Sequence, residues 1–362
     1  MSSSPTPSSF TLDVLANCSS PPGPRPSPED RQAEAGRVVQ MVATILIFLV
    51  GIPLNGLVVW ALAWRGRMER RGSRGESRGA NSFRVYVVNL ALADLVLLLR
   101  TPLALGYLIN GYSWPFGVAF CKLVIFLRCL GLYAAAFLLC AVALERCLCL
   151  LRPVWASLRR PRWAVPLACG LLWTLATALA APYFHTATLK EINSTHQCWD
   201  SDGASMGLFV TETMAGFLLP LLVFLGSNVA VLLSARQADT ATPTSSSSPA
   251  STARILRLYR VLFLTMLLFL TCWVPYFTCR FLRALSYGRP ELAGLYKASL
   301  KATYVSLFLV YLKSALNPVL YVFAARGLGR AVKASLISTI ERVFDDSESI
   351  RRKSLRRGNS QI

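Results

Sequence analysis

The amino-acid sequence predicts an all-α membrane protein, a seven-transmembrane helix bundle followed by a cytosolic amphipathic helix 8. The first observation is composition: 54% of the 362 residues are apolar and 15% are charged, whereas soluble chains carry about 25% charged residues. The second is a series of long apolar stretches, since about 20 residues cross the hydrocarbon layer. The third is that Lys and Arg lie in short segments between these stretches, as in membrane proteins.

Seven stretches of the chain are apolar enough and long enough to span a bilayer. They are expected to be helices, because a helix satisfies its own backbone hydrogen bonds in lipid. Together they form a transmembrane domain that covers residues 38–323. In chain order the predicted spans are residues 38–64, 83–109, 118–151, 163–183, 206–235, 255–285 and 295–323.

The segments that flank the transmembrane domain are polar. Residues 1–37 are rich in Pro and Ser, which predicts a disordered tail. Residues 324–344 carry apolar residues at helical spacing beside basic ones, which predicts amphipathic helix 8 on the inner leaflet. Residues 345–362 are expected to be a disordered tail whose serines, once phosphorylated, would recruit arrestin by charge.

The orientation of the chain follows from its loops. Basic residues gather after the first, third and seventh spans and before the sixth, and the opposite loops hold few. Because basic loops stay in the cytosol, the N-terminus is expected outside and the C-terminus in the cytosol. The glycosylation sequons at Asn17 and Asn193 both fall on the outside in this topology.

The net charge and the cysteines exclude other classes of protein. A net charge of +20 would suit nucleic-acid binding only on a basic face of a soluble domain, so no nucleic acid is expected. The ten cysteines form no CxxC pair and the two histidines stand apart. We therefore expect no metal site and no cofactor.

Polar residues inside the predicted spans are costly in hydrocarbon and mark function. Helix packing alone could explain the prolines and tryptophans among them, but it does not explain an ordered series of such features through the helices. The series has a feature in every helix: Asn55 in the first span, Asp94 in the second, Glu145 and Arg146 at the end of the third, Trp173 in the fourth, Pro220 in the fifth, Trp273 and Pro275 in the sixth, and Asn317, Pro318 and Tyr321 in the seventh.

On these motifs the chain resembles the rhodopsin-like (class A) G-protein-coupled receptors over about residues 38–344. The resemblance implies that Glu145 and Arg146 pair in the inactive state and that Arg146 then contacts the G protein. It implies a transmission layer made of Pro220, Phe269, Trp273 and Pro275.

The same resemblance gives the seventh-span motif a role. It implies that Asn317, Pro318 and Tyr321 form a hinge. It also implies a disulfide between Cys121 and Cys198, which the oxidising extracellular side would permit.

Lys313 departs from the family pattern. Family members usually hold a sodium ion beside the aspartate that corresponds to Asp94, with Asn or Ser at the position of Lys313. We expect the Lys313 ammonium to pair with Asp94 and replace the ion, because an unpaired buried ammonium is costly. The alternative is that the Lys313 side chain reaches elsewhere.

The expected ligand site lies between the outer halves of the helices. Arg100, Arg128 and Arg280 fall in this zone, where guanidinium groups would hold a carboxylate or phosphate. Glu212 adds a negative group, and the alternative is that the arginines pair with it or with backbone carbonyls and bind no ligand. Tyr276 and other aromatic residues nearby would suit a lipid tail.

Short segments narrow the resemblance to the chemoattractant and eicosanoid group, which includes the leukotriene B4, chemoattractant-type prostaglandin D2 and formyl-peptide receptors. They include Trp114-Pro-Phe-Gly and Gly216-Phe-Leu-Leu-Pro220. The resemblance implies a plasma-membrane receptor for an acidic lipid, an eicosanoid such as leukotriene B4 or prostaglandin D2, coupled to Gi-class G proteins. The alternatives are a receptor for a chemotactic peptide and a weakly signalling receptor-like scaffold.

Two other classes of membrane protein lack support in the sequence. A transporter would show an internal repeat with broken helices in both halves, and these spans show none. A membrane enzyme would need a catalytic constellation that two lone histidines do not supply. The chain is therefore predicted not to be an enzyme.

Overall fold

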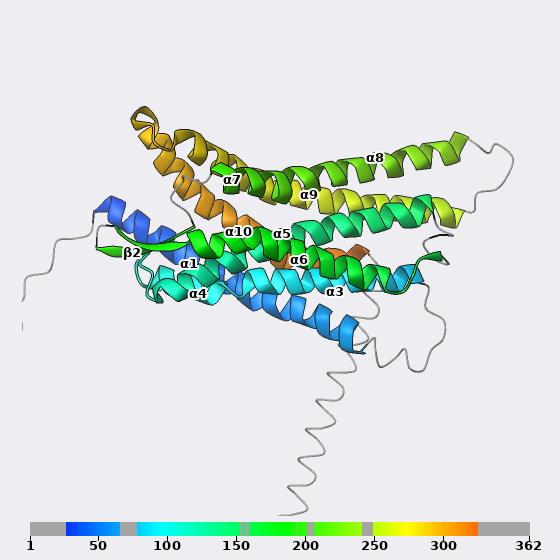
Figure 1. The fold of residues 1–362 in the computed structure, drawn as a ribbon, viewed down its shortest axis with the longest axis horizontal. Helices are drawn as coiled ribbons and strands as arrows, with labels where there is room; N and C mark the ends of the chain where they lie inside the picture. The colour runs from blue at the N-terminus through cyan, green and yellow to red at the C-terminus, as the bar shows by residue number, and fades with distance from the viewer. Residues whose placement is uncertain are drawn as a thin grey trace, which may run out of the picture.

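The computed structural model describes residues 27–65, 78–152, 155, 159–192, 194–200, 206–240 and 249–324. Long helices pack side by side along one axis, with a two-stranded sheet at one end, here termed the hairpin end (Figure 1). Six helical stretches of the described residues are long and apolar enough to cross a membrane.

Each of the seven predicted spans is helical in the described residues, which confirms the expected bundle. The last helix, α10, has the required length but is made more polar by Lys313 and Asn317. The elements are α1 (Pro28–Val59), the π-helical turn η1 (Trp60–Arg65), α3 (Arg78–Leu98), α4 (Thr101–Ile109), α5 (Gly117–Leu151), α6 (Ala164–Thr186), β1 (Thr188–Ile192), β2 (Thr195–Trp199), α7 (Met206–Thr213), the π-helical turn η3 (Met214–Leu218), α8 (Leu219–Thr240), α9 (Pro249–Ser286), the 3-10 turn η4 (Pro290–Leu292) and α10 (Ala293–Ala324).

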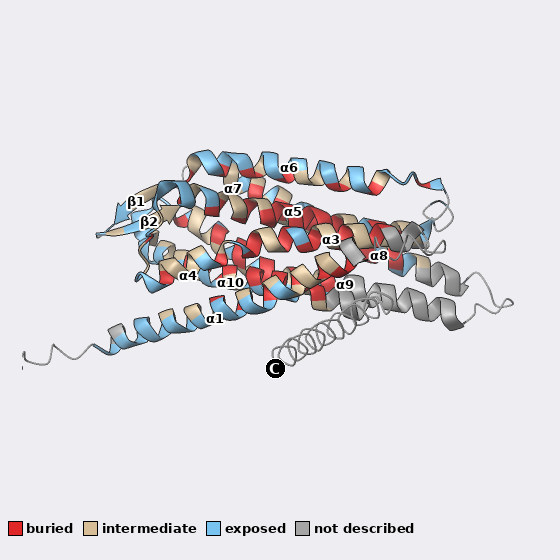
Figure 2. Ribbon diagram, turned by 90° about the horizontal axis from the view of Figure 1, so that it is seen from below, coloured by how far each residue is buried: buried red, intermediate tan, exposed pale blue. Residues whose placement is uncertain are grey.

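Helix α5 forms the centre of the bundle. Its apolar stretch is 78% buried, against 22% for α6 and 28% for α1, so these two helices lie at the periphery. Figure 2 shows the same contrast, with red along α5 and pale blue along much of α1 and α6. Exposed apolar side chains such as Leu46 and Leu171 cover these outer helices, as expected for surfaces that face lipid.

Helix α1 begins at Pro28, ten residues before the predicted span, so the predicted disorder of residues 1–37 is wrong for its last part. Proline suits the first helical position because its missing N–H would have no partner there. The Arg31 N–H donates to the Ser27 carbonyl at 3.1 Å, and Arg37 pairs with Glu34 one turn away.

The second predicted span is broken into α3 and α4 at Leu99 and Arg100, which the sequence analysis did not foresee. Pro102 lacks the N–H that would continue the helical bond to the Leu98 carbonyl. The Thr101 hydroxyl donates to that carbonyl instead, at 2.6 Å. The Leu98 carbonyl therefore still accepts a hydrogen bond at the break.

Pro318 likewise frees a carbonyl inside α10, that of Ser314. The side chain of Asn55 on α1 donates to the Ser314 carbonyl at 3.1 Å and to the Gly51 carbonyl at 2.9 Å. Asn55 is fully buried, so this bond joins α1 to α10 at the proline.

The β-hairpin is fixed to the N-terminal end of α5. Strands β1 and β2 pair antiparallel, with Leu189 opposite Cys198. Cys198 forms a disulfide with Cys121 on α5, which confirms the predicted pair. The Trp114 N–H, just before α5, donates to the His196 carbonyl at 2.7 Å. The covalent and hydrogen bonds together set the position of the residue that follows β2.

Several predictions concern residues outside the described part of the chain. Helix 8 at residues 324–344 falls there apart from its first residue, as do the tail at residues 345–362 and the sequons at Asn17 and Asn193. For Tyr321 the structure describes the helical backbone but not the side chain.

The close approach of α3 and α5 at Gly131 gives a stability prediction. A Cβ at this position would lie 2.9 Å from the Leu97 Cβ and 3.0 Å from its backbone N. Because backbone atoms cannot move aside cheaply, Gly131→Ala should destabilise the bundle by about 1–3 kcal/mol. The measurement is thermal unfolding of the purified protein in detergent micelles.

Gly170→Ala on α6 is the matched control, because nothing lies within 4 Å of its added Cβ. Its melting temperature should equal or slightly exceed the wild-type value, because alanine is more favourable than glycine in a helix interior by about 0.5–1 kcal/mol. Equal losses in the two variants would show that the α3–α5 contact is not the cause.

Candidate functional site

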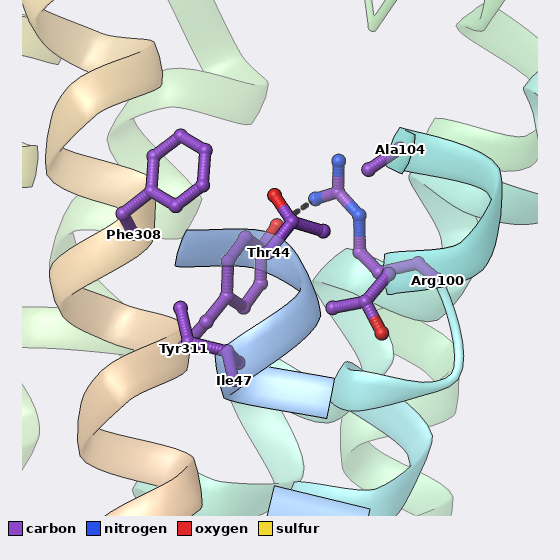
Figure 3. Close-up of a pocket in the computed structure, with 7 residues that line it drawn as sticks. Thr44, Ile47, Arg100, Ala104, Phe308 and Tyr311 are labelled. Carbon is purple, nitrogen blue, oxygen red and sulfur yellow. Dashed lines mark hydrogen bonds between the residues drawn. The ribbon is translucent and has the colours of Figure 1, made fainter. Parts of the chain in front are cut away.

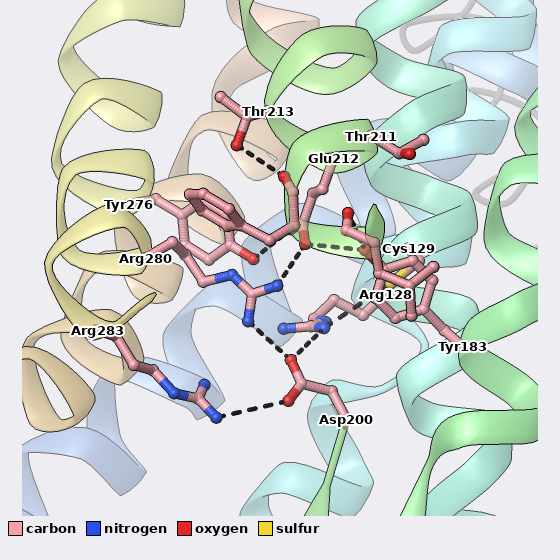
Figure 4. Close-up of polar contacts among 12 residues, drawn as sticks. Arg128, Cys129, Tyr183, Asp200, Thr211, Glu212, Thr213, Tyr276, Arg280 and Arg283 are labelled. Carbon is pink, nitrogen blue, oxygen red and sulfur yellow. Dashed lines mark hydrogen bonds and ion pairs between the residues drawn. The ribbon is translucent and has the colours of Figure 1, made fainter. Parts of the chain in front are cut away.

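Five charged side chains meet at the hairpin end and form what we term the arginine–carboxylate cluster (Figure 4). Arg128 comes from α5, Asp200 directly follows β2, Glu212 comes from α7, and Arg280 and Arg283 come from α9. Three helices and the hairpin therefore contribute to one site. Most of these side chains are nearly fully buried, with Arg283 12% exposed.

Asp200 bridges α5 to α9. Its Oδ2 accepts hydrogen bonds from Arg128 Nη2 at 3.0 Å and from Arg280 Nη1 at 2.9 Å. Its Oδ1 lies 3.8 Å from Arg283 Nη2. The backbone carbonyl of Asp200 also accepts a bond from the Thr186 hydroxyl at 3.0 Å. Two guanidinium groups thus converge on one carboxylate oxygen.

Glu212 is held by a different set of donors. Its Oε1 accepts a bond from the Tyr276 hydroxyl at 2.7 Å, and its Oε2 accepts one from the Tyr183 hydroxyl at 3.0 Å. Arg280 Nη2 also donates to Oε2. Glu212 is therefore bound to both α6 and α9 through neutral hydroxyls as well as a charge.

The charges of the cluster do not cancel. Among the residues that the structure describes, three guanidinium groups face two carboxylates, an excess of one positive charge in a buried site. Burial opposes the charge of Asp200, but Arg280, Arg128 and Arg283 outweigh it and hold the pKa of Asp200 well below its ordinary value. The Arg128 Nε is buried and has no hydrogen-bond partner among the described residues. The site therefore keeps a donor available for another acceptor.

Arg100, which was expected beside the other arginines, lies in a separate place (Figure 3). It donates to the Tyr311 hydroxyl and faces a small cavity between α1, α4 and α10. The cavity is also lined by Thr44 and Phe308. Among the described contacts, no hydrogen bond or ion pair joins Arg100 to the arginine–carboxylate cluster.

Aromatic rings form a layer beneath the cluster. The Trp273 ring stacks on Phe277 at 5.5 Å and on Phe269 at 5.6 Å between centroids. Phe217, from the π-helical turn η3, stacks on Phe277 at 4.9 Å. Tyr276, which binds Glu212, meets the Trp273 ring edge-on. The layer links the charged cluster to the proline-containing middle of α9.

Asp94 and Lys313 are buried at the middle of the bundle but form no close ion pair. Asp94 accepts a hydrogen bond from Asn317 at 2.7 Å. Lys313 is 2% exposed and attracts Asp94 electrostatically, yet no ion pair of the described residues joins the two. The expected Asp94–Lys313 salt bridge is therefore not formed, because Asn317, one turn further along α10, takes the position next to the carboxylate. The Lys313 side chain stays buried in the bundle.

At the end opposite the hairpin, Glu145 pairs with a residue that was not expected. Arg160 Nη1 lies 2.5 Å from Glu145 Oε2, and Arg160 also donates to the Ser82 hydroxyl on α3. Arg146 stacks on the Phe83 ring at 3.5 Å instead of pairing with Glu145. The expected Glu145–Arg146 pair does not form, because neighbouring residues on a helix point in different directions. Arg160 lies in the segment between α5 and α6 and pairs with Glu145 from there.

Asp200 and Arg283 are cluster residues that the sequence analysis missed. Arg283 lies one turn beyond Arg280 on α9 and could have been inferred from helical spacing. Asp200 stands two residues after Cys198, which is joined to α5 by the disulfide. The disulfide was therefore a signal that the Asp200 carboxylate lies near the hairpin end of the helices. The predicted residues Arg128, Glu212, Tyr276 and Arg280 are brought together, and Arg100 is not.

Comparison with known proteins agrees with this architecture. The family model described as 7 transmembrane receptor (rhodopsin family) matches residues 54–321. The C3a anaphylatoxin chemotactic receptor of Danio rerio is 29% identical over 313 residues, which cover 86% of this chain and 78% of the relative. Apelin receptor A of Danio rerio is 30% identical over 308 residues, 78% of this chain and 77% of the relative. Prostaglandin D2 receptor 2 of Rattus norvegicus is 28% identical over 319 residues, 84% of this chain and 72% of the relative.

The pairing pattern predicts unequal roles for two neighbouring arginines. Arg280→Ala removes a partner from both Asp200 and Glu212 and should cost about 3–5 kcal/mol, as expected when one member of a buried ion pair is removed. Arg283→Ala removes only the 3.8 Å contact to Asp200 and a stacking contact with Trp199. Its loss should be about 1 kcal/mol or less.

Thermal unfolding of both variants in detergent micelles would measure this difference. Similar melting temperatures for the two variants would contradict the assignment of Arg280 as the central cation of the cluster.

Proposed function

Because this chain belongs to the rhodopsin family of seven-transmembrane receptors, we propose that it transduces a carboxylate-bearing ligand signal to heterotrimeric G proteins. The proposed ligand class is an acidic lipid, with an eicosanoid such as prostaglandin D2 or leukotriene B4 as the first candidate. The observation that carries this proposal is the buried arginine–carboxylate cluster, which has three guanidinium groups against two carboxylates.

The sign of the cluster charge favours an anion over an amine. Arg128 and Arg280 offer the forked N–H geometry that suits a carboxylate. The carboxylate that could attract a cation, Glu212, already accepts bonds from Tyr183, Tyr276 and Arg280. A cationic ligand would therefore lose more in repulsion from the arginines than it gained from Glu212.

The aromatic layer supports a ligand with an apolar part. Phe217, Phe277 and Trp273 stack beneath the charged groups, and Leu307 on α10 is buried among the core residues. A lipid acid would place its carboxylate at the arginines and its chain against these rings. Because Trp273 stands two residues before Pro275 on α9, ligand contacts there would bear on the part of the helix that can bend.

The proposed topology places the hairpin end outside the cell. The Cys121–Cys198 disulfide at this end suits an oxidising compartment, and the basic loops at the other end suit the cytosol. Arg146, which is stacked on Phe83 and not tied to Glu145, would then meet the G protein. We propose the Gi class, with arrestin binding after phosphorylation of the tail.

A chemotactic peptide is the second candidate ligand. The chain is related to chemotactic receptors, of which the C3a anaphylatoxin chemotactic receptor is one. The C-terminal carboxylate of a peptide carries the same charge as a lipid acid and could bind the same arginines. Formylated and other peptides therefore belong in the ligand screen beside the lipid acids.

The proposed ligand class can be tested by cAMP inhibition in cells that express the full chain. Prostaglandin D2, leukotriene B4, oleate and the methyl ester of each would be applied, and the free acids should act while the esters should not. Arg128→Ala should lower the potency of an active acid at least about tenfold, because one charge-assisted hydrogen bond contributes about 1.5–3 kcal/mol.

Lys122→Ala is the matched control, because it removes a cation from the same helix outside the cluster. Unchanged acid potency in Arg128→Ala, or a response to amines and not to acids or peptides, would overturn the proposal.

The Glu145–Arg160 pair predicts a change in basal signalling. Arg160→Ala leaves the buried Glu145 without its partner and breaks the link to Ser82 on α3, which should destabilise the resting arrangement. Ligand-independent G-protein activation should rise several-fold. The neighbouring exposed Arg159→Ala serves as the control and should leave it unchanged.

Basal G-protein activation would be measured by nucleotide exchange on membranes with matched receptor levels. Activity at or below the wild-type value in Arg160→Ala would contradict a resting role for this pair.

A further inference from the structure

The two carboxylates of the cluster are held in different ways. Glu212 lies on α7 and is fixed by two tyrosine hydroxyls in addition to Arg280. Asp200 lies past the end of β2, outside any helix or strand, and its carboxylate contacts guanidinium groups in the described structure. The first carboxylate belongs to the helix framework, and the second is a side chain on a loop.

The position of the Asp200 carboxylate is the one that a bound carboxylate ligand would take. It lies between Arg128 of α5 and Arg280 of α9, at 3.0 and 2.9 Å, with Arg283 next to it. A ligand carboxylate cannot contact both Arg128 and Arg280 in this way while Asp200 stays in place. The unpartnered Arg128 Nε is a further donor that Asp200 leaves unused.

We propose that Asp200 is a tethered carboxylate that occupies the anion site, and that a ligand with a free carboxylate binds by displacing it. This inference rests on the proposed function, and it names the step by which the ligand enters. No covalent chemistry is involved, because one carboxylate replaces another on the same guanidinium groups.

The exchange is energetically feasible because it keeps the charge balance of the buried site. When Asp200 leaves, its carboxylate regains hydration at the hairpin end, and the ligand carboxylate restores the lost ion pairs. A tethered group competes at an effective concentration of the order of millimolar. Asp200 should therefore lower the apparent affinity of every carboxylate ligand and favour ligands that gain additional binding from an apolar chain.

Removal of the tethered carboxylate should open the anion site to a small external carboxylate. Purified full-length Asp200→Ala receptor would be unfolded thermally in sodium acetate and in sodium chloride at equal ionic strength. Acetate should raise its melting temperature by about 2–5 °C, as expected for a ligand that binds the folded state. The wild type, whose site is filled, should show no difference between the two salts.

Two further variants assign the shift to the site. The double variant Asp200→Ala/Arg128→Ala should show a smaller acetate shift than Asp200→Ala, because one of the two guanidinium groups that donate to the carboxylate is gone. Glu191→Ala, at an exposed position of β1 in the same hairpin, should behave as the wild type does. If Asp200→Ala folds only when acetate is present, that result also supports the proposal. Asp200→Asn, which keeps the size of the side chain, then replaces it in the comparison.

The outcomes separate this inference from the proposed function. Equal acetate shifts in the wild type and in both Asp200 variants, or none in any of them, would overturn the tethered carboxylate. Acid-evoked signalling that depends on Arg128 would still stand in that case. An acetate shift confined to the Asp200 variants, with no acid active in cells, would keep Asp200 in the anion site and contradict the proposed ligand class.

Discussion

A charged group buried in a helix bundle that faces lipid is costly unless a partner inside the protein compensates its charge. This constraint organises both ends of the molecule. At the hairpin end Arg128 and Arg280 meet Asp200, and at the opposite end Glu145 meets Arg160. In both places a loop residue supplies a charge that joins helices. Ion pairs therefore join the helices at both ends of the bundle, and a ligand or a partner protein could take the place of one member of such a pair.

The same constraint acts on the backbone. Pro102 and Pro318 each leave a carbonyl without its helical donor, and a side chain takes the place of that donor. The Thr101 hydroxyl serves the Leu98 carbonyl, and Asn55 serves the Ser314 carbonyl from another helix. At these two prolines the carbonyl that loses its backbone donor is therefore still hydrogen-bonded.

The helix bundle could be predicted from the sequence because each helix that crosses the hydrocarbon layer needs about 20 mostly apolar residues. The third predicted span begins one residue from the start of α5 and ends with it at residue 151. The break at Pro102 and the early start at Pro28 were missed, since a hydropathy pattern does not register a local hydrogen-bond exchange or a polar helical extension. The Cys121–Cys198 disulfide was predicted from a family resemblance, and the spacing of the cysteines alone would not have given it.

The side-chain partners were harder to predict. Asp200 is 72 residues from Arg128 and 80 from Arg280 along the chain, so its pairing depends on how the hairpin folds back. Glu145 was expected to pair with its neighbour Arg146 but meets Arg160, 15 residues later. Asp94 is bound by Asn317 and not by Lys313. One member of each pair was predicted, namely Arg128, Arg280, Glu145 and Asp94, but tertiary geometry decided the partner, and Asp200 was not predicted at all.

The buried charges of the arginine–carboxylate cluster stabilise the folded bundle only as pairs. A double-mutant cycle of Arg280→Met and Glu212→Gln, followed by reversible unfolding in lipid–detergent micelles, tests this most directly. Each single change should destabilise the protein strongly, and the double variant should be more stable than the sum of the two losses predicts, by about 1–3 kcal/mol. Losses that simply add would show that the two side chains act independently and would contradict the account.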